Sequence, residues 1–118
     1  MTEKKNPLMN LVYSADIPLA TVSVKLKKGK EKIQAGTVLA VGTDGYAVAV
    51  DSAKSGQGQD KPYAILAFDS EERDADVFAT AYSSGMFNGG VLTFGGSDNL
   101  EKHKEAMRAL GMFVKEMV

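Results

Sequence analysis

The sequence predicts a small, β-rich α+β domain with hairpins, one C-terminal helix followed by a final strand, and an extended N-terminal arm. Most apolar segments are short, alternate with a period of two and are separated by glycine-containing turns, as is typical of strands. A single segment near the C-terminus has the spacing and end signals of a helix. The chain of 118 residues, 44% hydrophobic and 25% charged, has room for one packed domain. We expect the arm to comprise residues 1–32 and the domain residues 33–118.

The N-terminal arm differs from the rest of the chain in charge. It contains seven lysines and three acidic residues, which gives a net charge of +4. Because the net charge of the whole chain is −1, residues 33–118 carry a net charge of −5. In residues 20–27 the apolar side chains Val22, Val24 and Leu26 alternate with polar ones, which predicts a half-buried strand. No hairpin partner follows, because residues 27–32 form a lysine-rich turn. We interpret these lysines as a solvated loop; contact with an acidic partner is the alternative.

Hairpins account for most of the remaining chain. The pair Asp44-Gly45 lies between two apolar runs at 34–41 and 46–50, which is a strong hairpin signal. Further along we expect a polar loop at 51–61, a buried strand at 62–68, a strand at 75–82, turns at 83–85 and 88–90, and a strand at 91–94. Many apolar residues are alanine and there is no tryptophan, so the predicted core is modest. A modest core favours further burial against copies of the chain or a partner.

The helix is predicted near residues 98–110. Asp98 is a candidate N-cap, with Glu101 three residues later as in a capping box. Its apolar row contains Leu100, Met107 and Leu110, with His103 in the same row. Gly111 is expected to end the helix, and residues 112–118 to form a final strand. One longer helix is the alternative, but it would place Gly111 in its interior at a cost of about 1 kcal/mol.

Composition excludes several kinds of chemistry. The sequence has no cysteine and one histidine, which excludes disulfides, thiolate chemistry and histidine-rich metal sites. Its balanced charge gives no reason to expect nucleic acid as a partner. No apolar run approaches the ~20 residues of a membrane span, and no signal-peptide pattern is visible, so we expect no membrane partner.

No segment has the pattern of a catalytic or cofactor site. Five acidic residues within eight positions predict a solvated connection, since they lack the spacing of a calcium loop; they are Asp69, Glu71, Glu72, Asp74 and Asp76. A calcium site or an acid/base pair is the alternative there. The glycines of 56–58 lack the third glycine and helix of a phosphate loop, and 83–85 lacks the nucleophile elbow. We therefore expect no enzyme, no cofactor and no metal.

The order of several short motifs is distinctive. Residues 33–39 open a hairpin, 63–67 form an apolar strand, and 77–88 run from a strand through Gly85 to an aromatic residue. A helix, Gly111 and a closing strand complete the series. In this order the motifs resemble the bacteriophage head decoration proteins, the family of the lambda head-stabilising protein D, over residues 33–118. Ala64 stands where a glycine would be expected, and the arm is more basic than the family pattern.

The resemblance implies a structural, non-enzymatic protein that is made in the bacterial host cytoplasm and located on the outer capsid surface of a virion. It implies homotrimers that bind the expanded capsid and reinforce it against internal DNA pressure. It also implies an arm that contacts the major capsid protein by strand addition, departing at Pro18. The arm residues expected in this contact are Leu19, Ala20, Thr21, Val22, Ser23, Val24, Lys25 and Leu26. For the trimer interface we expect Met86, Phe87 and the neighbouring turns.

Two other functions are compatible with the residues. One is a small β-rich module of a tail or surface structure that binds a ligand or glycan through the loop at 51–61. Saturable binding of a small ligand without any capsid would favour it. The other is an enzyme, which would require turnover that depends on a carboxylate of the acidic segment. We expect no small-molecule substrate.

Overall fold

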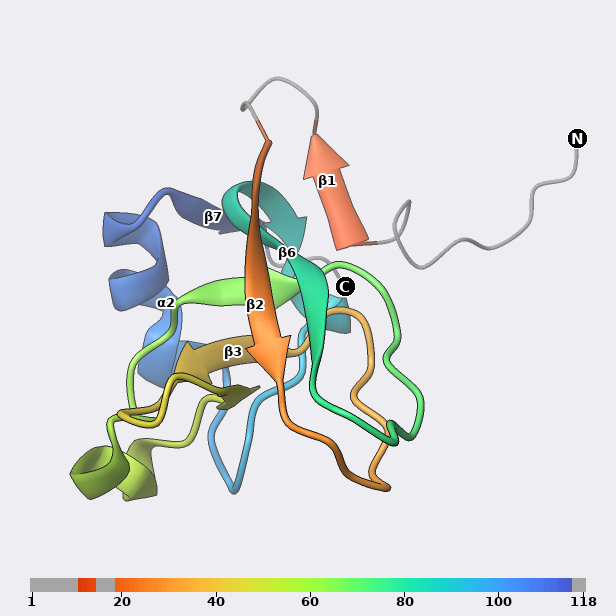
Figure 1. Ribbon diagram of the computed structural model, residues 1–118. Coiled ribbons are helices and arrows are strands. Elements are labelled where there is room, and N and C mark those ends of the chain that lie inside the picture. Colours follow the sequence, from red (N-terminus) through yellow and green to blue (C-terminus); the bar gives the residue numbers. More distant parts are fainter. Residues whose placement is uncertain (1–10, 15–18, 116–118) are drawn as a thin grey trace, which may run out of the picture.

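The computed structural model describes residues 11–14 and 19–115, which form one seven-stranded sheet (Figure 1). The strands are β1 (Val12–Ser14), β2 (Ala20–Leu26), β3 (Val38–Val41), β4 (Ala47–Ala49), β5 (Ala64–Leu66), β6 (Val77–Asn88) and β7 (Met112–Lys115). The helices are α2 (Leu100–Ala109) and the short 3₁₀ helices η1 (Ser52–Gln57) and η2 (Gly89–Val91). All strand pairs are antiparallel except β6 with β7. The β-rich α+β architecture, with one C-terminal helix and a final strand, is as predicted.

The long strand β6 connects two halves of the sheet. Its first half pairs with β2 and β5, and its second half pairs with β1 and β7. The change of partners occurs around Gly85, whose φ of 146° is in the region that favours glycine. A Cβ at this position would lie 2.6 Å from Cδ2 of Leu19. The turn predicted at 83–85 is therefore wrong, because the chain continues as a strand through the serines and the glycine.

The strand predicted at 91–94 is also wrong. Residues Gly89–Val91 form η2, whose N-cap Asn88 accepts a hydrogen bond from the backbone N–H of Gly90. Of this segment only Thr93 makes a ladder contact, a single parallel bridge to Thr37. The turn predicted at 88–90 is present as the start of η2, but the apolar residues after it pack against the core without pairing over their length.

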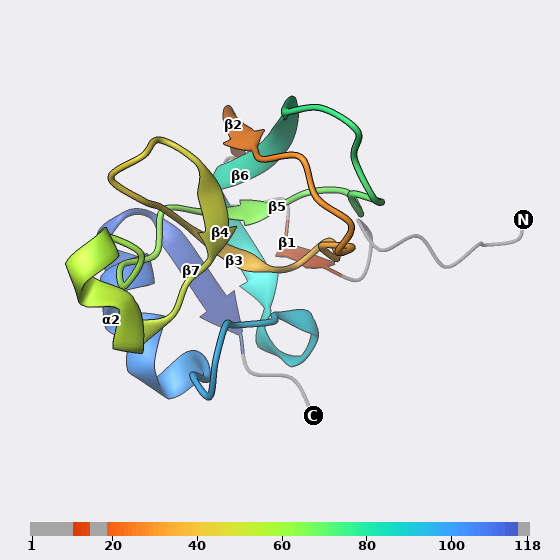
Figure 2. The same ribbon diagram turned by 60° about the horizontal axis from the view of Figure 1, so that its bottom comes forward.

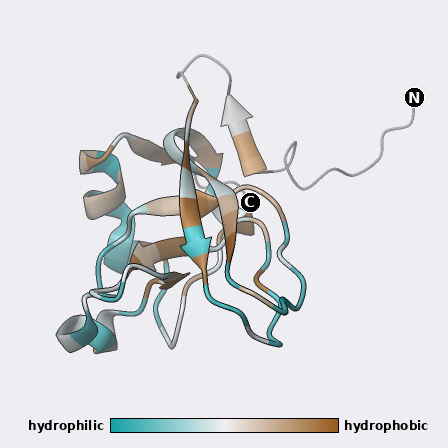
Figure 3. Cartoon of the chain, viewed as in Figure 1, coloured by the Kyte–Doolittle hydropathy of each residue, from teal (hydrophilic) through white to brown (hydrophobic). Residues whose placement is uncertain are grey.

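Two hydrophobic clusters hold the sheet together. One includes Leu11, Ile65, Phe87, Met107 and Met112, and joins the sheet, including β7, to α2. The other includes Val24, Leu26, Leu39, Leu66 and Ala81, and lies between β2, β3, β5 and β6. Figure 3 shows hydrophobic residues concentrated on the strands and hydrophilic residues on the loops at the lower end of the view. Alanine contributes to both clusters, as the composition suggested.

The hairpin of β3 and β4 follows the prediction. Gly45 has a φ of 87°, and the N–H of Gly42 donates to the carbonyl of Tyr46 at 3.0 Å across the turn. The middle pair of this short ladder is Ala40 with Val48. The Asp-Gly signal thus marks a true hairpin turn.

The helix lies where it was predicted, but its N-cap is one residue later than expected. The N-cap is Asn99, whose Oδ1 accepts a hydrogen bond from the N–H of Lys102 at 3.3 Å. The helix ends before Gly111, which has a φ of 98°, and β7 follows at once. The shorter of the two alternatives is therefore the observed one. Residues 116–118, the end of the predicted final strand, lie outside the described residues.

The strand predicted in the arm is present, but it has a partner within the chain. β2 pairs with β6 over its whole length, from Ala20 opposite Ser84 to Leu26 opposite Val77. The strand has no hairpin neighbour, as expected, and its partner is a strand far along the chain. Residues 1–10 and 15–18, including Pro18, lie outside the described residues. Figure 2 shows β2 and β6 side by side, with β4 nearby.

Candidate functional site

The segment predicted to contact the capsid lies at an open edge of the sheet. Along β2 the inward side chains Val24 and Leu26 are buried, whereas Thr21, Ser23 and Lys25 are exposed. Among the described residues, β6 is the only strand hydrogen-bonded to β2. On its other side β2 comes close to β4 without a hydrogen-bonded ladder between them, so its backbone groups there have no strand partner among the described residues. Leu19, just before β2, is 44% exposed.

A shallow groove of about 320 Å³ runs beside this edge. Its lining from β2 consists of Ser23, Val24 and Lys25, and the other lining residues are Val41, Gly45, Tyr63 and Phe78. Phe78 is 74% exposed and Tyr63 is 43% exposed, so two aromatic side chains flank the groove. Exposed aromatic surface next to an unpaired strand is typical of a docking site.

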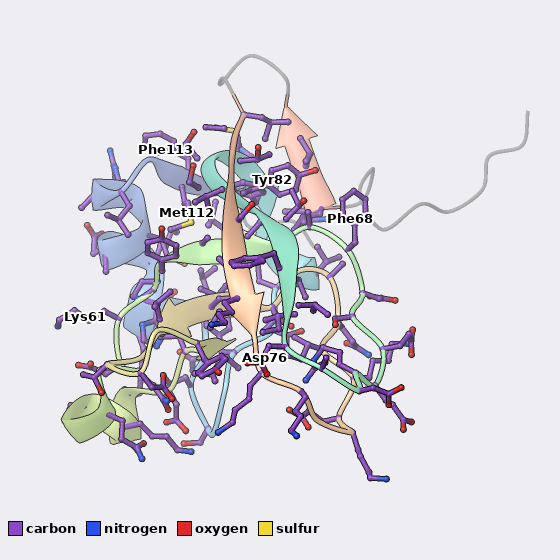
Figure 4. The ribbon with its side chains drawn as sticks, in the orientation of Figure 1. Lys61, Phe68, Asp76, Tyr82, Met112 and Phe113 are labelled. Atoms are coloured by element: carbon purple, nitrogen blue, oxygen red, sulfur yellow. The ribbon has the colours of Figure 1, made fainter. Side chains whose placement is uncertain are left out.

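Side chains rather than a hydrogen-bonded ladder connect β2 to the turn before β4. The hydroxyl of Tyr46 donates to Oδ2 of Asp76 at 2.6 Å, and the N–H of Lys28 donates to Oδ1 of the same carboxylate at 2.9 Å. The ammonium groups of Lys25 and Lys27 lie 5.2 Å and 5.6 Å from the centre of the Tyr46 ring. The hydrogen bond to Asp76 raises the pKa of Tyr46 and lowers the pKa of Asp76. Figure 4 labels Asp76 at the lower end of β2 and β6.

The residues predicted for a trimer interface have different environments. Phe87 is fully buried and packs with Tyr82, with ring centres 5.6 Å apart. Met86 is only partly buried. Both residues lie on the half of β6 that pairs with β1 and β7. The interface assignment stays a prediction, and Phe87 in addition belongs to the core of this chain.

The lysine-rich loop and the acidic connection, both predicted as solvated, lie against each other. Gly29 and Arg73 exchange two backbone hydrogen bonds of 3.1 Å and 2.8 Å, and Ile33 and Ser70 exchange two more. The ammonium of Lys32 lies 3.7 Å from Asp69 and 3.8 Å from Glu71. The opposite charges of the two segments were visible in the sequence, but their contact was not predicted.

Arg73 is the centre of this contact and was missed by the sequence analysis. Its side chain is 5% exposed, and its guanidinium donates to the carbonyls of Lys27, Glu31 and Glu71 and to the hydroxyl of Ser70. It also lies 3.3 Å from the carboxylate of Glu31. An arginine surrounded by acidic residues is the only sequence signal for such a role.

A group of three polar side chains, of which His103 and Asp98 have little exposed side-chain surface and Ser52 is exposed, lies between η1 and α2, away from the β2 edge. Nε2 of His103 lies 2.6 Å from Oδ2 of Asp98, while the hydroxyl and backbone N–H of Ser52 both donate to Asp98 at 2.7 Å. These hydrogen bonds, that of His103 first, lower the pKa of Asp98 to about 2. The serine hydroxyl contacts the aspartate and not the histidine, so the group is not a nucleophile activated by a base. It fastens η1 to the start of the helix.

Neither a metal-binding group nor a membrane-spanning helix is found in the described part of the chain. There, no three or more histidine, aspartate or glutamate side chains are grouped so that they could hold a metal ion. No helix within residues 11–14 and 19–115 combines the length and apolar character that a membrane crossing requires. The glycines of 56–58 lie at the end of η1, where Gly58 has a φ of 74° and caps that short helix.

The fold and the surface define a small, mainly antiparallel β domain with one helix and an open, aromatic-flanked strand edge. The family model of the bacteriophage lambda head decoration protein D matches residues 1–113. The chain belongs to this family, which supports a role in decorating a phage capsid and a location on the virion. The match extends the resemblance noted above through the N-terminal segment. No individually curated protein matches the sequence significantly.

Proposed function

We propose that this protein is a structural, non-enzymatic decoration protein that binds the outside of the expanded capsid as a homotrimer and reinforces it against internal DNA pressure. Residues Leu19 to Leu26 contact the major capsid protein in this proposal. Nucleic acid, membranes and small molecules are not among its partners. Family membership supports the capsid role, and the open outer edge of β2 supports the position of the contact.

The mechanism of attachment follows from the geometry of β2. Because this strand already pairs with β6, it is held extended before docking and presents one row of backbone donors and acceptors. A capsid segment that pairs with this row gains main-chain hydrogen bonds and loses less conformational freedom than if both strands were unstructured. Burial of Phe78 and Tyr63 would add apolar contact.

Reinforcement of the capsid then follows from the linkage between binding of this protein and rupture of the shell. A protein that binds the intact shell more tightly than the ruptured shell raises the free energy of rupture, by an amount that grows with occupancy. A trimer engages several capsid subunits at once, so that each contact raises the effective concentration of the others.

Co-sedimentation with expanded capsids of the parent phage tests this function. We expect the full chain to pellet with capsids at saturating, symmetric occupancy. Phe78→Ser should weaken binding at least tenfold, because it removes the most exposed apolar side chain of the groove. Phe68→Ser is the matched control: Phe68 is 58% exposed but does not line the groove.

Three outcomes decide the proposal. Binding by the wild type and the Phe68 variant, with loss in the Phe78 variant, supports both the decoration role and the site. Equal binding by both variants excludes the groove as the contact. Failure of the wild type to bind capsids contradicts the decoration role itself, and saturable binding of a glycan would then favour the alternative module.

A further inference from the structure

The strands β2 and β4 lie near each other without a hydrogen-bonded ladder. Some of their Cα atoms are within 8 Å of one another, yet β2 pairs with β6 and β4 pairs with β3. We call the strip between the two strands the seam. Strands of a ladder are about 4.8 Å apart, so a further strand between β2 and β4 would need a separation of about 9.5 Å. Pairing of a capsid strand with the outer side of β2 therefore requires the seam to widen.

Of the two strands at the seam, β4 is the one that can move. β2 pairs with β6 over its whole length. β3 is fixed between β4 and β5, and its residues Val38, Leu39 and Ala40 are fully buried. β4 has three residues, of which Val48 and Ala49 are only partly buried. Short elements with little buried surface open at low cost in free energy, so displacement of β4 is the easiest way to widen the seam.

Packing on both sides of the seam is incomplete. The groove of about 320 Å³ takes its walls from β2 and from Gly45 in the turn before β4. A cavity of about 390 Å³ takes its walls from the three residues of β4 and from the loop after β2, including Lys27. Atoms that line a hollow have lost contacts on one side. Few packing contacts therefore resist a movement of β4 away from β2.

Tyr46 connects the two sides of the seam. It lies just before β4, and its hydroxyl donates to Oδ2 of Asp76, just before β6, at 2.6 Å. The N–H of Lys28, in the loop after β2, donates to Oδ1 of the same carboxylate at 2.9 Å. The ammonium groups of Lys25 and Lys27 lie 5.2 Å and 5.6 Å from the centre of the Tyr46 ring. One side chain of the β3–β4 hairpin is thus held by β2, by the loop after it and by the start of β6.

These contacts are strong enough to hold the seam and accessible enough to release it. A hydrogen bond to a carboxylate is stronger than one between neutral groups, and this bond lowers the pKa of Asp76. Asp76 is nevertheless exposed and Tyr46 is only partly buried, so water can replace both partners. Contacts of cations with an exposed aromatic ring are also weak. Such contacts can open while the core stays folded.

We propose that Tyr46 and Asp76 form a latch that keeps the seam closed in the free protein, and that its release lets β4 move away from β2. A capsid strand then pairs with the outer backbone groups of β2. The role of the open state rests on the proposed decoration function, whereas the latch itself rests on the contacts of Tyr46.

Amide hydrogen exchange of the full chain, followed by NMR, tests the latch without capsids. The variant Tyr46→Phe removes the hydroxyl and keeps the ring. The reporter is the N–H of Val48, which points towards β3, because the N–H of Val50 donates to Val38 and alternate residues of an antiparallel strand point the same way. We expect this N–H to exchange about fivefold faster in the variant, an effect typical of the loss of one hydrogen bond.

An internal reference separates opening of the seam from unfolding. The N–H of Leu66 donates to the carbonyl of Thr37 at 2.9 Å, and Leu66 is fully buried. Its exchange in Tyr46→Phe should equal that in the wild type, since the latch does not reach this part of the core.

Two further variants sharpen the test. Thr43→Val is the matched control, because it removes a hydroxyl from the same turn at an exposed residue outside the latch. It should leave the exchange of Val48 unchanged. Asp76→Ala should accelerate Val48 as Tyr46→Phe does. The double variant should add little to Asp76→Ala alone, because both substitutions remove the same hydrogen bond.

The rate of association with expanded capsids tests the role of the open state. Co-sedimentation after increasing incubation times measures this rate. Tyr46→Phe should associate severalfold faster than the wild type, because a larger fraction of its molecules has an open seam. Thr43→Val should associate at the rate of the wild type.

Each part of the proposal can be overturned separately. Unchanged exchange at Val48 in both latch variants would show that Tyr46 does not hold the seam. Equal acceleration at Val48 and Leu66 would show that Tyr46 supports the whole fold. Faster exchange at Val48 without faster association would show that opening of the seam is not a step in docking. A wild type that never binds capsids contradicts the decoration function and the docking step with it, while the exchange data still decide whether the latch exists.

Discussion

Asp98 illustrates how one buried carboxylate can connect two distant segments. It accepts hydrogen bonds from the hydroxyl and N–H of Ser52 in η1, and it pairs with His103 in α2. His103 in turn stacks on Phe94, with ring centres 5.7 Å apart and an angle of 9° between the planes. The ionised form of Asp98 is stabilised by all three contacts, which gives the folded state a defined dependence on pH.

The free energy of unfolding should fall at low pH because Asp98 becomes protonated. Its pKa is about 2 in the folded chain and 3.8 in its unperturbed state, so the unfolded chain takes up this proton first as pH falls. The contribution of Asp98 is therefore fully present above about pH 4 and is lost as pH falls towards 2. We expect Asp98→Asn to be less stable than the wild type at pH 7, with a difference that shrinks between pH 4 and pH 2. Urea unfolding at several pH values measures it.

The control for this experiment is Asp74→Asn, which alters an exposed aspartate of the acidic connection. Its effect on the free energy of unfolding should be small at every pH. A difference between the wild type and the Asp98 variant that stays constant down to pH 2 would show that the carboxylate does not carry this pH dependence.

The role of Asp98 also shows a limit of sequence analysis at the scale of single residues. Both Asp98 and Asn99 are favourable N-cap residues, and Glu101 fits a capping box with the first of them. The structure uses Asn99, because Asp98 turns towards Ser52, 46 positions away. A contact of that separation leaves no local pattern, so the choice between two neighbouring caps could not be predicted.

At the scale of elements, β2 is part of the core. Leu26 is fully buried and Val24 is 3% exposed, both in the cluster shared with β3, β5 and β6. Deletion of residues 1–26 would thus remove a paired strand and two core side chains. Such a deletion would be expected to destabilise the fold, and it cannot separate docking from folding.

Single substitutions test the position of β2 more cleanly. We expect Leu26→Ala to lower the free energy of unfolding by about 3 kcal/mol, the usual cost of truncating a buried leucine. Leu110→Ala, at a leucine that is 53% exposed, should change it by less than about 1 kcal/mol. Chemical denaturation of both variants measures the difference. Similar small losses would mean that residues 20–26 do not pack on the sheet in solution.

The elements that could be predicted are those with local causes. The β3–β4 turn needs Gly45, and the end of α2 needs Gly111, since both adopt positive φ. The same logic failed at Gly85, whose positive φ lies within a strand, where a Cβ would clash with the side chains of Leu19 and Phe87, and not in a turn. The partner of β2 is separated from it by about 55 residues along the chain, and alternation alone predicts a strand without indicating what it pairs with.

At the scale of the molecule, β2 and β4 come close to each other without a hydrogen-bonded ladder between them. The groove beside β2 is lined by the aromatic side chains of Tyr63 and Phe78, whereas the cavity beside β4 is lined by cations and small apolar residues. Between them, Tyr46 holds the ends of β2 and β4 together through Asp76 and two lysines.

The proposed trimer has a thermodynamic signature of its own. The clusters of the single chain are small and rich in alanine, while Phe68, Phe78, Leu19 and Leu110 are 44% exposed or more. If folded trimers are in equilibrium with unfolded single chains, the midpoint of thermal unfolding must rise with protein concentration. We expect a rise of several degrees over a hundredfold range, and a mass in light scattering three times the 12.6 kDa of one chain. A midpoint independent of concentration, together with the mass of one chain, would contradict a trimer in free solution and leave assembly on the capsid as the only route to it.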